Sequence, residues 1–176
     1  MTKRIALLLS TGLLIAFGAI AVACGDDGGG GGLTLEEYFQ RAVELDQEHE
    51  AVAEPQRAIL DQSLQGLADE AALPAGAREA LKELHAEEIN FAEALSGLQP
   101  AAEAEDAHRE AIDALQAEAV VFGEIVDQLN ETTTLAQLNE LFESEEAVQA
   151  EERRTSACLA LQQLASDNNA EAALTC

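Results

Sequence analysis

The residues of this 176-residue chain best suited to metal chemistry are its three histidines and the acids near them. Glu105 and His108 have the Glu-x-x-His spacing with which some helical bundles ligate pairs of metal ions, and Asp46 precedes His49 at the same interval. Side chains three residues apart share one face of a helix, so each pair could offer an oxygen and a nitrogen to one ion. The two pairs are the first candidates for a metal site.

The positions of the histidines along the predicted helices argue against a shared site. His49 lies about 23 residues before the first predicted turn, so an antiparallel neighbour would place a residue near 100 opposite it. His108 would then lie roughly 12 Å away, and His85 about 9 Å further on. The ligands of one ion lie about 2 Å from it. We therefore expect no metal site and no cofactor, with histidines that are solvated or hydrogen-bonded on helix flanks.

Other catalytic patterns are missing from the sequence. There is no Gly-x-Ser-x-Gly, no His-Glu-x-x-His and no phosphate-binding glycine loop. Adjacent acids such as Glu87 and Glu88 are frequent, but paired acids divide acid and base roles only when their surroundings separate their pKa values. On a helix this acidic, such pairs are expected to form a solvated face. We therefore expect a protein that is not an enzyme.

The balance of charge excludes one class of partner. The chain has 34 acidic and 9 basic residues, a formal net charge of -25. Phosphate backbones are bound by clustered Lys and Arg, so we expect no nucleic-acid partner. Apolar residues make up 48% of the chain, enough for a core. The acidic faces could instead attract an envelope protein or another cationic ligand through forces that fade with salt.

Residues 1–23 have the pattern of an export signal. Lys3 and Arg4 form a positive start, and the rest is an uncharged apolar run that ends in small residues. Ala21-Val22-Ala23-Cys24 then resembles a bacterial lipobox, in which the cysteine is acylated before cleavage makes it the first residue. This resemblance implies that Cys24 is the site of lipid attachment. A plain signal peptide cleaved nearby, or an uncleaved membrane helix, is the alternative.

Residues 24–32 predict a lipidated cysteine followed by a flexible tether. Gly25-Asp26-Asp27 and five further glycines have no apolar face and great backbone freedom. The eight residues after the cysteine reach at most about 28 Å when extended. We therefore expect residues 33–176 to be an acidic helical domain that is held by lipid at a bacterial membrane, outside the cytoplasm.

Cys158 and Cys176 are the two cysteines that remain if Cys24 carries lipid. An even pair in an oxidising compartment predicts one disulfide. Cys158 lies inside a predicted helix that ends about 15 Å further along, and the last eight residues can span that distance back. Two free thiols or a redox pair are the alternative, which the missing Cys-x-x-Cys spacing disfavours.

The composition and apolar spacing of residues 33–176 predict an all-α domain. Thr34 and Glu37 form a capping box at the start of a long first helix, and Pro55 should kink that helix or split it in two. The expected apolar stripe of this helix comprises Leu35, Tyr38, Phe39, Ala42, Leu45, His49, Val52, Ile59, Leu64, Leu67 and Ala71.

The rest of the domain predicts three more long helices and a short one. Thr134 and Gln137 offer a second capping box, and Ser144 is the expected cap of the last helix. Short connections force neighbouring helices to run antiparallel, so we expect an up-down antiparallel bundle of about four long helices with one short helix. The expected helices after the first span about residues 77–98 and 101–130, a short helix from its cap at Thr134 to Phe142, and a last helix from its cap at Ser144 to about residue 167.

The leader, Cys24, the tether and the helical remainder together resemble bacterial lipoproteins, in particular uncharacterised all-helical exported ones. The resemblance implies attachment to a membrane and names no activity. The sequence therefore predicts a lipid-anchored, non-enzymatic module that binds or scaffolds another component of the cell envelope. A ligand- or metal-carrying bundle of the ferritin-like kind is the alternative.

Overall fold

The computed structural model describes residues 32–170 and 172–176. The predicted signal peptide, Cys24 and most of the predicted tether therefore lie outside the described residues. The described part is all-α and consists of α2 (Leu35–Leu64), α3 (Ala75–Ser96), the 3-10 turn η1 (Ala102–Ala104), α4 (Glu105–Gln128), α5 (Leu135–Phe142) and α6 (Glu145–Asp167). The predicted fold class is confirmed.

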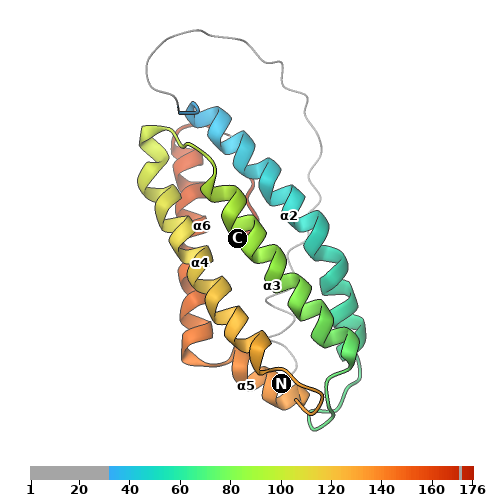
Figure 1. Ribbon diagram of the computed structural model, residues 1–176. Helices are drawn as coiled ribbons and strands as arrows, with labels where there is room; N and C mark the ends of the chain where they lie inside the picture. Colours follow the sequence, from blue (N-terminus) through green and yellow to red (C-terminus); the bar gives the residue numbers. More distant parts are fainter. Residues whose placement is uncertain (1–31, 171) are drawn as a thin grey trace.

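The four long helices follow one another around the bundle in chain order, each reversing the direction of the one before (Figure 1). α2 packs along α3, α3 along α4 and α4 along α6, while the short α5 lies at the turn between α4 and α6. The backbones of α2 and α6 approach each other much less closely. This side of the bundle is where the C-terminal residues pack, as described below.

Three predicted helix caps are present. The hydroxyl of Thr34 accepts a hydrogen bond from the backbone N–H of Glu37 at 3.3 Å, and the Glu37 carboxylate accepts from the Thr34 N–H at 2.9 Å. Thr134 and Gln137 make the same reciprocal pair at the start of α5. The Ser144 hydroxyl accepts from an N–H in the first turn of α6. Each cap satisfies donors that the helix cannot, which fixes where the helices begin.

α2 ends earlier than its sequence suggests. It runs continuously through Pro55, so the proline does not split it. The helix stops at Leu64 because Gly66 takes a φ of 74°, a left-handed conformation that glycine adopts at little cost. The prediction that the stripe continues in helix to Ala71 is therefore wrong. Residues 65–74 instead form the connection to α3, in which the Leu73 N–H bonds to the Thr133 carbonyl at 2.8 Å.

Two members of the predicted apolar stripe do not face the core. Val52 is 51% exposed and Ile59 is 44% exposed. Their immediate successors, Ala53 and Leu60, are buried instead. One residue turns an α-helix by about 100°, so a stripe read from Val52 and Ile59 points to the flank of α2 rather than to its inner face. The third helix also begins later than predicted, because η1 intervenes after Pro100.

Apolar clusters fill the bundle from end to end. The cluster nearest α5 is built around Leu60, Leu81 and Leu138, and the cluster at the opposite end around Tyr38, Phe39 and Leu161. A smaller middle cluster consists of Ala42, Ala92, Leu95 and Leu115. Its members come from α2, α3 and α4, so the inner faces of three helices meet at this level.

Candidate functional site

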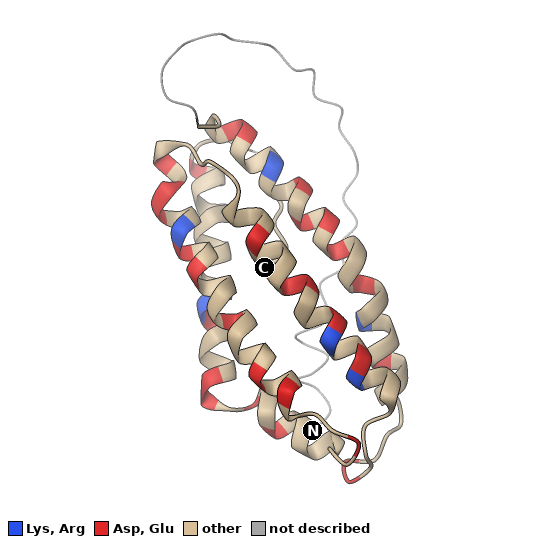
Figure 2. Cartoon of the chain, in the orientation of Figure 1, with Lys and Arg blue, Asp and Glu red and all other residues tan. Residues whose placement is uncertain are grey.

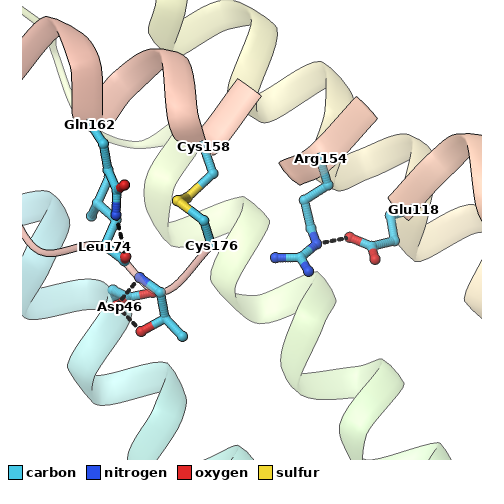
Figure 3. The surroundings of a disulfide bond; sticks show 8 residues. Asp46, Glu118, Arg154, Cys158, Gln162, Leu174 and Cys176 are labelled. Atoms are coloured by element: carbon cyan, nitrogen blue, oxygen red, sulfur yellow. Dashed lines mark hydrogen bonds and ion pairs between the residues drawn. A yellow bond between two sulfur atoms is a disulfide. The ribbon is translucent and has the colours of Figure 1, made fainter. Parts of the chain in front are cut away.

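Charged side chains from three helices meet inside the bundle. Glu88 belongs to α3, Glu118 to α4 and Arg154 to α6. The Nε atom of Arg154 lies 2.6 Å from Oε2 of Glu118, and these side chains are 25% and 17% exposed (Figure 3). The carboxyl group of Glu88 neighbours that of Glu118. We refer to Glu88, Glu118 and Arg154 as the charged layer.

The carboxyl groups of the charged layer hold protons more tightly than solvated acids do. Burial raises the pKa of Glu88 well above its usual range, and the neighbouring Glu118 adds to the increase, while Arg154 and Arg57 oppose it. Burial also raises the pKa of Glu118, against the attraction of Arg154. A neutral Glu88 beside a Glu118–Arg154 ion pair is the arrangement that leaves the fewest uncompensated charges inside the bundle.

The charged layer was not predicted. The sequence suggested that Glu87 and Glu88 form a solvated face, which is wrong for both, because Glu88 is partly buried beside Glu118 and the Glu87 side chain is 16% exposed beside His49. A signal was present. Glu88 lies four residues after Leu84 and seven before Leu95, both buried, and Glu118 lies three residues after the buried Leu115. An acid in register with a buried apolar stripe indicates an interior carboxyl group.

The charged layer has the groups for proton transfer but is placed inside the protein. Two carboxyl groups with separated pKa values can divide the roles of acid and base. A surface hollow of about 630 Å³ lies at the end of the bundle where α2 begins, and its lining includes Leu33, Pro100 and Glu105 but no member of the layer. In the described structure the Glu118–Arg154 ion pair joins α4 to α6, and Glu88 brings a carboxyl group of α3 to the same level.

The histidines lie at three separate places. His49 Nδ1 is 3.4 Å from a carboxylate oxygen of Glu87, and its ring stacks on Phe91 with centroids 4.7 Å apart. His85 Nε2 lies 3.0 Å from the Ala119 carbonyl oxygen. The expectation that residue 100 faces His49 is wrong, because α2 ends at residue 64 and residues 65–74 take no part in the helix pair.

His108 is buried rather than solvated, and its Nδ1 lies 3.1 Å from the Tyr38 hydroxyl oxygen. Burial lowers the pKa of His108 and raises the pKa of Tyr38 to about 12, so both stay neutral near pH 7. Glu105, the acid in Glu-x-x-His spacing with His108, is exposed. Among the described residues no three His, Cys, Asp or Glu side chains are grouped so as to hold a metal ion.

Cys158 and Cys176 are brought together as predicted. Their Sγ atoms lie 2.02 Å apart, and their Cα atoms 5.6 Å apart. Nearby, the N–H and hydroxyl of Thr175 donate to one carboxylate oxygen of Asp46, at 3.1 and 2.9 Å (Figure 3). The side-chain amide of Gln162 donates to the Leu174 carbonyl at 2.6 Å. We name residues 172–176 the C-terminal strap.

Asp46, the other predicted metal candidate, serves the C-terminal strap instead. It is only 6% exposed, and burial raises its pKa, while the two hydrogen bonds from Thr175 oppose this. A buried carboxylate is expensive unless donors surround it. The strap supplies those donors, and in return Asp46 fixes the end of the chain against α2.

The surface of the domain carries acid without matching base (Figure 2). Asp26 and Asp27 precede residue 33, as do Lys3 and Arg4, so 32 of the 34 acids and 7 of the 9 bases belong to residues 33–176. The seventh base, Arg78, donates to the Leu73 carbonyl. The other six bases form ion pairs within the domain: Arg41–Glu44, Arg57–Glu50, Lys82–Glu79, Arg109–Asp106, Arg153–Glu110 and Arg154–Glu118.

No family model, curated protein or solved structure matches this chain. Within residues 32–170 and 172–176, none of the helices combines the length and the apolar character needed to cross a membrane. Proposals about function therefore depend on three features: the N-terminal sequence, the acidic surface, and the C-terminal strap beside the charged layer.

Proposed function

We propose that this protein is a lipid-anchored, extracytoplasmic module that is not an enzyme and that binds a cationic component of the cell envelope. The observation that carries the proposal is the internal pairing of its bases. Six of the seven bases in residues 33–176 have an acidic partner in the same domain, and the seventh bonds to a carbonyl group. Most of the remaining acids in the described part of the chain are exposed, with Asp46 and Glu88 as interior exceptions, and no Lys or Arg of residues 33–176 is left to pair with them.

An acid excess of this size creates a field that extends beyond direct contact. The Debye length is about 8 Å at physiological ionic strength, so charges on neighbouring helix flanks act together on an approaching ligand. Such a field raises the association rate of oppositely charged partners and repels anionic lipid. A basic segment of an envelope protein, or a cationic peptide, has the matching chemistry.

The end of the bundle at which Leu33 lies indicates which faces of the domain would point away from a lipid anchor. The Leu33 N–H bonds to the Gln99 carbonyl at 3.0 Å, which holds the start of α2 against the connection between α3 and α4. A chain anchored at Cys24 would therefore join the domain at this end of the bundle. The helix flanks and the end that carries α5 would then face away from the attachment point.

Binding of a lysine decapeptide to the purified full chain tests the proposal by calorimetry. We expect binding at about 0.01 M salt and its loss near 1 M, because the Debye length falls from about 30 Å to about 3 Å over this range. Removing three exposed acids of α2 in the variant Glu48→Gln/Glu54→Gln/Asp61→Asn should weaken binding. Arg109→Gln, which removes an exposed base, should strengthen it.

Two results would contradict the proposal. One is the absence of binding at the lowest ionic strength, and the other is an affinity that salt leaves unchanged. Crosslinking in intact envelopes then identifies the partner, with Cys24→Ser as the matched control that keeps the domain and removes the predicted anchor.

A further inference from the structure

The C-terminal strap reaches the middle of the bundle, on the side where α2 and α6 are not closely packed. Leu174 packs against both the Tyr38–Phe39 cluster and the middle cluster. Thr175 bonds to Asp46 of α2, and Cys176 is joined to Cys158 of α6. The strap thus joins α2 to α6, whose backbones approach each other less closely than those of the other neighbouring long helices.

The strap lies one helical turn from the charged layer on each of three helices. Cys158 follows Arg154 by four residues on α6. The middle cluster under Leu174 includes Ala92, four residues after Glu88, and Leu115, three residues before Glu118. Since three or four residues make one turn, the strap occupies the next level of the bundle above the charged layer. Figure 3 shows the Cys158–Cys176 bond and the Arg154–Glu118 pair in one neighbourhood.

We propose that the Cys158–Cys176 disulfide is a latch that keeps the C-terminal strap between α2 and α6, and that its reduction releases the strap and admits water to the charged layer. The reductant is a dithiol. Its two electrons and two protons convert the S–S bond into two thiols, and the dithiol itself becomes a disulfide. Both cysteines are only partly buried, so a small dithiol can reach them.

The contacts that remain after reduction are few. Three hydrogen bonds hold Leu174 and Thr175, and the apolar contacts of Ala172 and Leu174 add to them. Each bond exchanges with water on release, so its net contribution is small compared with its strength in isolation. Chain ends without a covalent tie open readily. The strap is therefore poised to leave once the latch is broken.

Release of the strap changes the surroundings of the carboxyl groups in the layer. Glu88 is faced by Glu118 from α4, by Arg154 from α6 and by Arg57 from α2, and Glu151 of α6 also acts on Glu118. None of these groups belongs to the strap. Reduction therefore leaves the charges in place and changes their hydration, which lowers the pKa values of the two carboxyl groups towards those of solvated glutamate.

The test compares the oxidised full chain with the same protein in dithiothreitol. Reduction should speed hydrogen exchange of the Thr175 amide at least tenfold, and carbonyl-carbon NMR should show lower pKa values for Glu88 and Glu118. Reoxidation should restore both. Asp46→Asn, which keeps the disulfide, should leave the carboxyl titration close to that of the oxidised protein.

The double variant Cys158→Ser/Cys176→Ser should reproduce the reduced state and should not respond to dithiothreitol. The proposal is overturned if the reduced chain keeps the slow exchange of Thr175 and an unchanged carboxyl titration. It is equally overturned if reduction unfolds the whole bundle, seen as loss of helical circular dichroism, because a latch opens one face only. If the double variant does not fold, the wild-type comparison still decides between these outcomes.

Discussion

The Nε atom of Arg154 on α6 lies 2.6 Å from Oε2 of Glu118 on α4. One residue earlier on α6, Arg153 pairs with Glu110 of the same helix α4 at 2.9 Å, but those side chains are 45% and 54% exposed. The two pairs join the same helices and differ in burial. The chain thus contains its own control for what a partly buried ion pair contributes to the bundle.

Arg154→Ala should lower the free energy of unfolding by about 3 kcal/mol, because it leaves the Glu118 carboxylate buried without a cation. Arg153→Ala should cost much less, because an exposed ion pair contributes little to stability. Urea unfolding of both variants measures the difference. Equal effects would show that the charged layer contributes no more than a surface pair.

Glu88→Gln should make stability less dependent on pH. The folded pKa of Glu88 lies well above its ordinary 4.5, so its contribution to stability is fully present below pH 4.5 and is lost as pH rises through the folded pKa. Wild-type protein should therefore gain stability as pH falls through the raised pKa of Glu88 towards 4.5. The variant should gain less, and it should be more stable than wild type at the upper end.

The matched control for this prediction is Glu83→Gln, an exposed acid on the same helix. Its pH profile should follow the wild-type profile. His108, whose pKa is lowered by burial, costs stability as pH falls below 6.5, but it does so in every variant and cancels in the comparison. Identical pH profiles for Glu88→Gln and wild type would contradict the buried, protonated state of Glu88.

Removal of the disulfide with Cys158→Ser/Cys176→Ser should lower stability by about 3 kcal/mol, the chain-entropy contribution of a loop of this size. The two cysteines are separated by 18 residues. Thermal unfolding measures the loss, and intact mass shows whether the native protein gains two protons on reduction. No gain in mass on reduction would show that the thiols are free.

Gly123→Ala should destabilise the bundle by about 1 kcal/mol, since overpacking costs more than the gain in helix propensity. A Cβ atom at Gly123 would lie 2.8 Å from Nε2 of His85, which is held by the Ala119 carbonyl. Gly76→Ala is the control, because its Cβ would meet only the Ser63 hydroxyl at 3.4 Å. That variant should be neutral or slightly stabilising, and a reversed order of the two would contradict the packing of His85.

The helix starts could be predicted because a cap is a local event. Thr34, Thr134 and Ser144 each bond within the next three residues, so the spacing in the sequence contains the whole interaction. The pairing of Cys158 with Cys176 could be predicted because the chain has only three cysteines and Cys24 is assigned to lipid attachment. The end of α2 is also set locally, by the left-handed conformation of Gly66. The apolar residues after Gly66 continue the spacing of the stripe, however, and suggested a longer helix.

The charged layer could not be derived in the same way. Glu88, Glu118 and Arg154 are brought together by three helices whose relative rotation depends on all of their side chains. Val52 and Ile59 show the same limit, because a difference of one residue decides between core and surface. The position of the C-terminal strap likewise depends on the gap between α2 and α6, which only the assembled bundle defines.

The intact mass of the protein isolated from the membranes of the cells that produce it tests the proposed anchoring most directly. The account predicts a chain that begins at an acylated Cys24, and an unacylated product when Cys24 is replaced by Ser. A mature chain that begins elsewhere without lipid, or one that keeps residues 1–23 as a membrane helix, would contradict it.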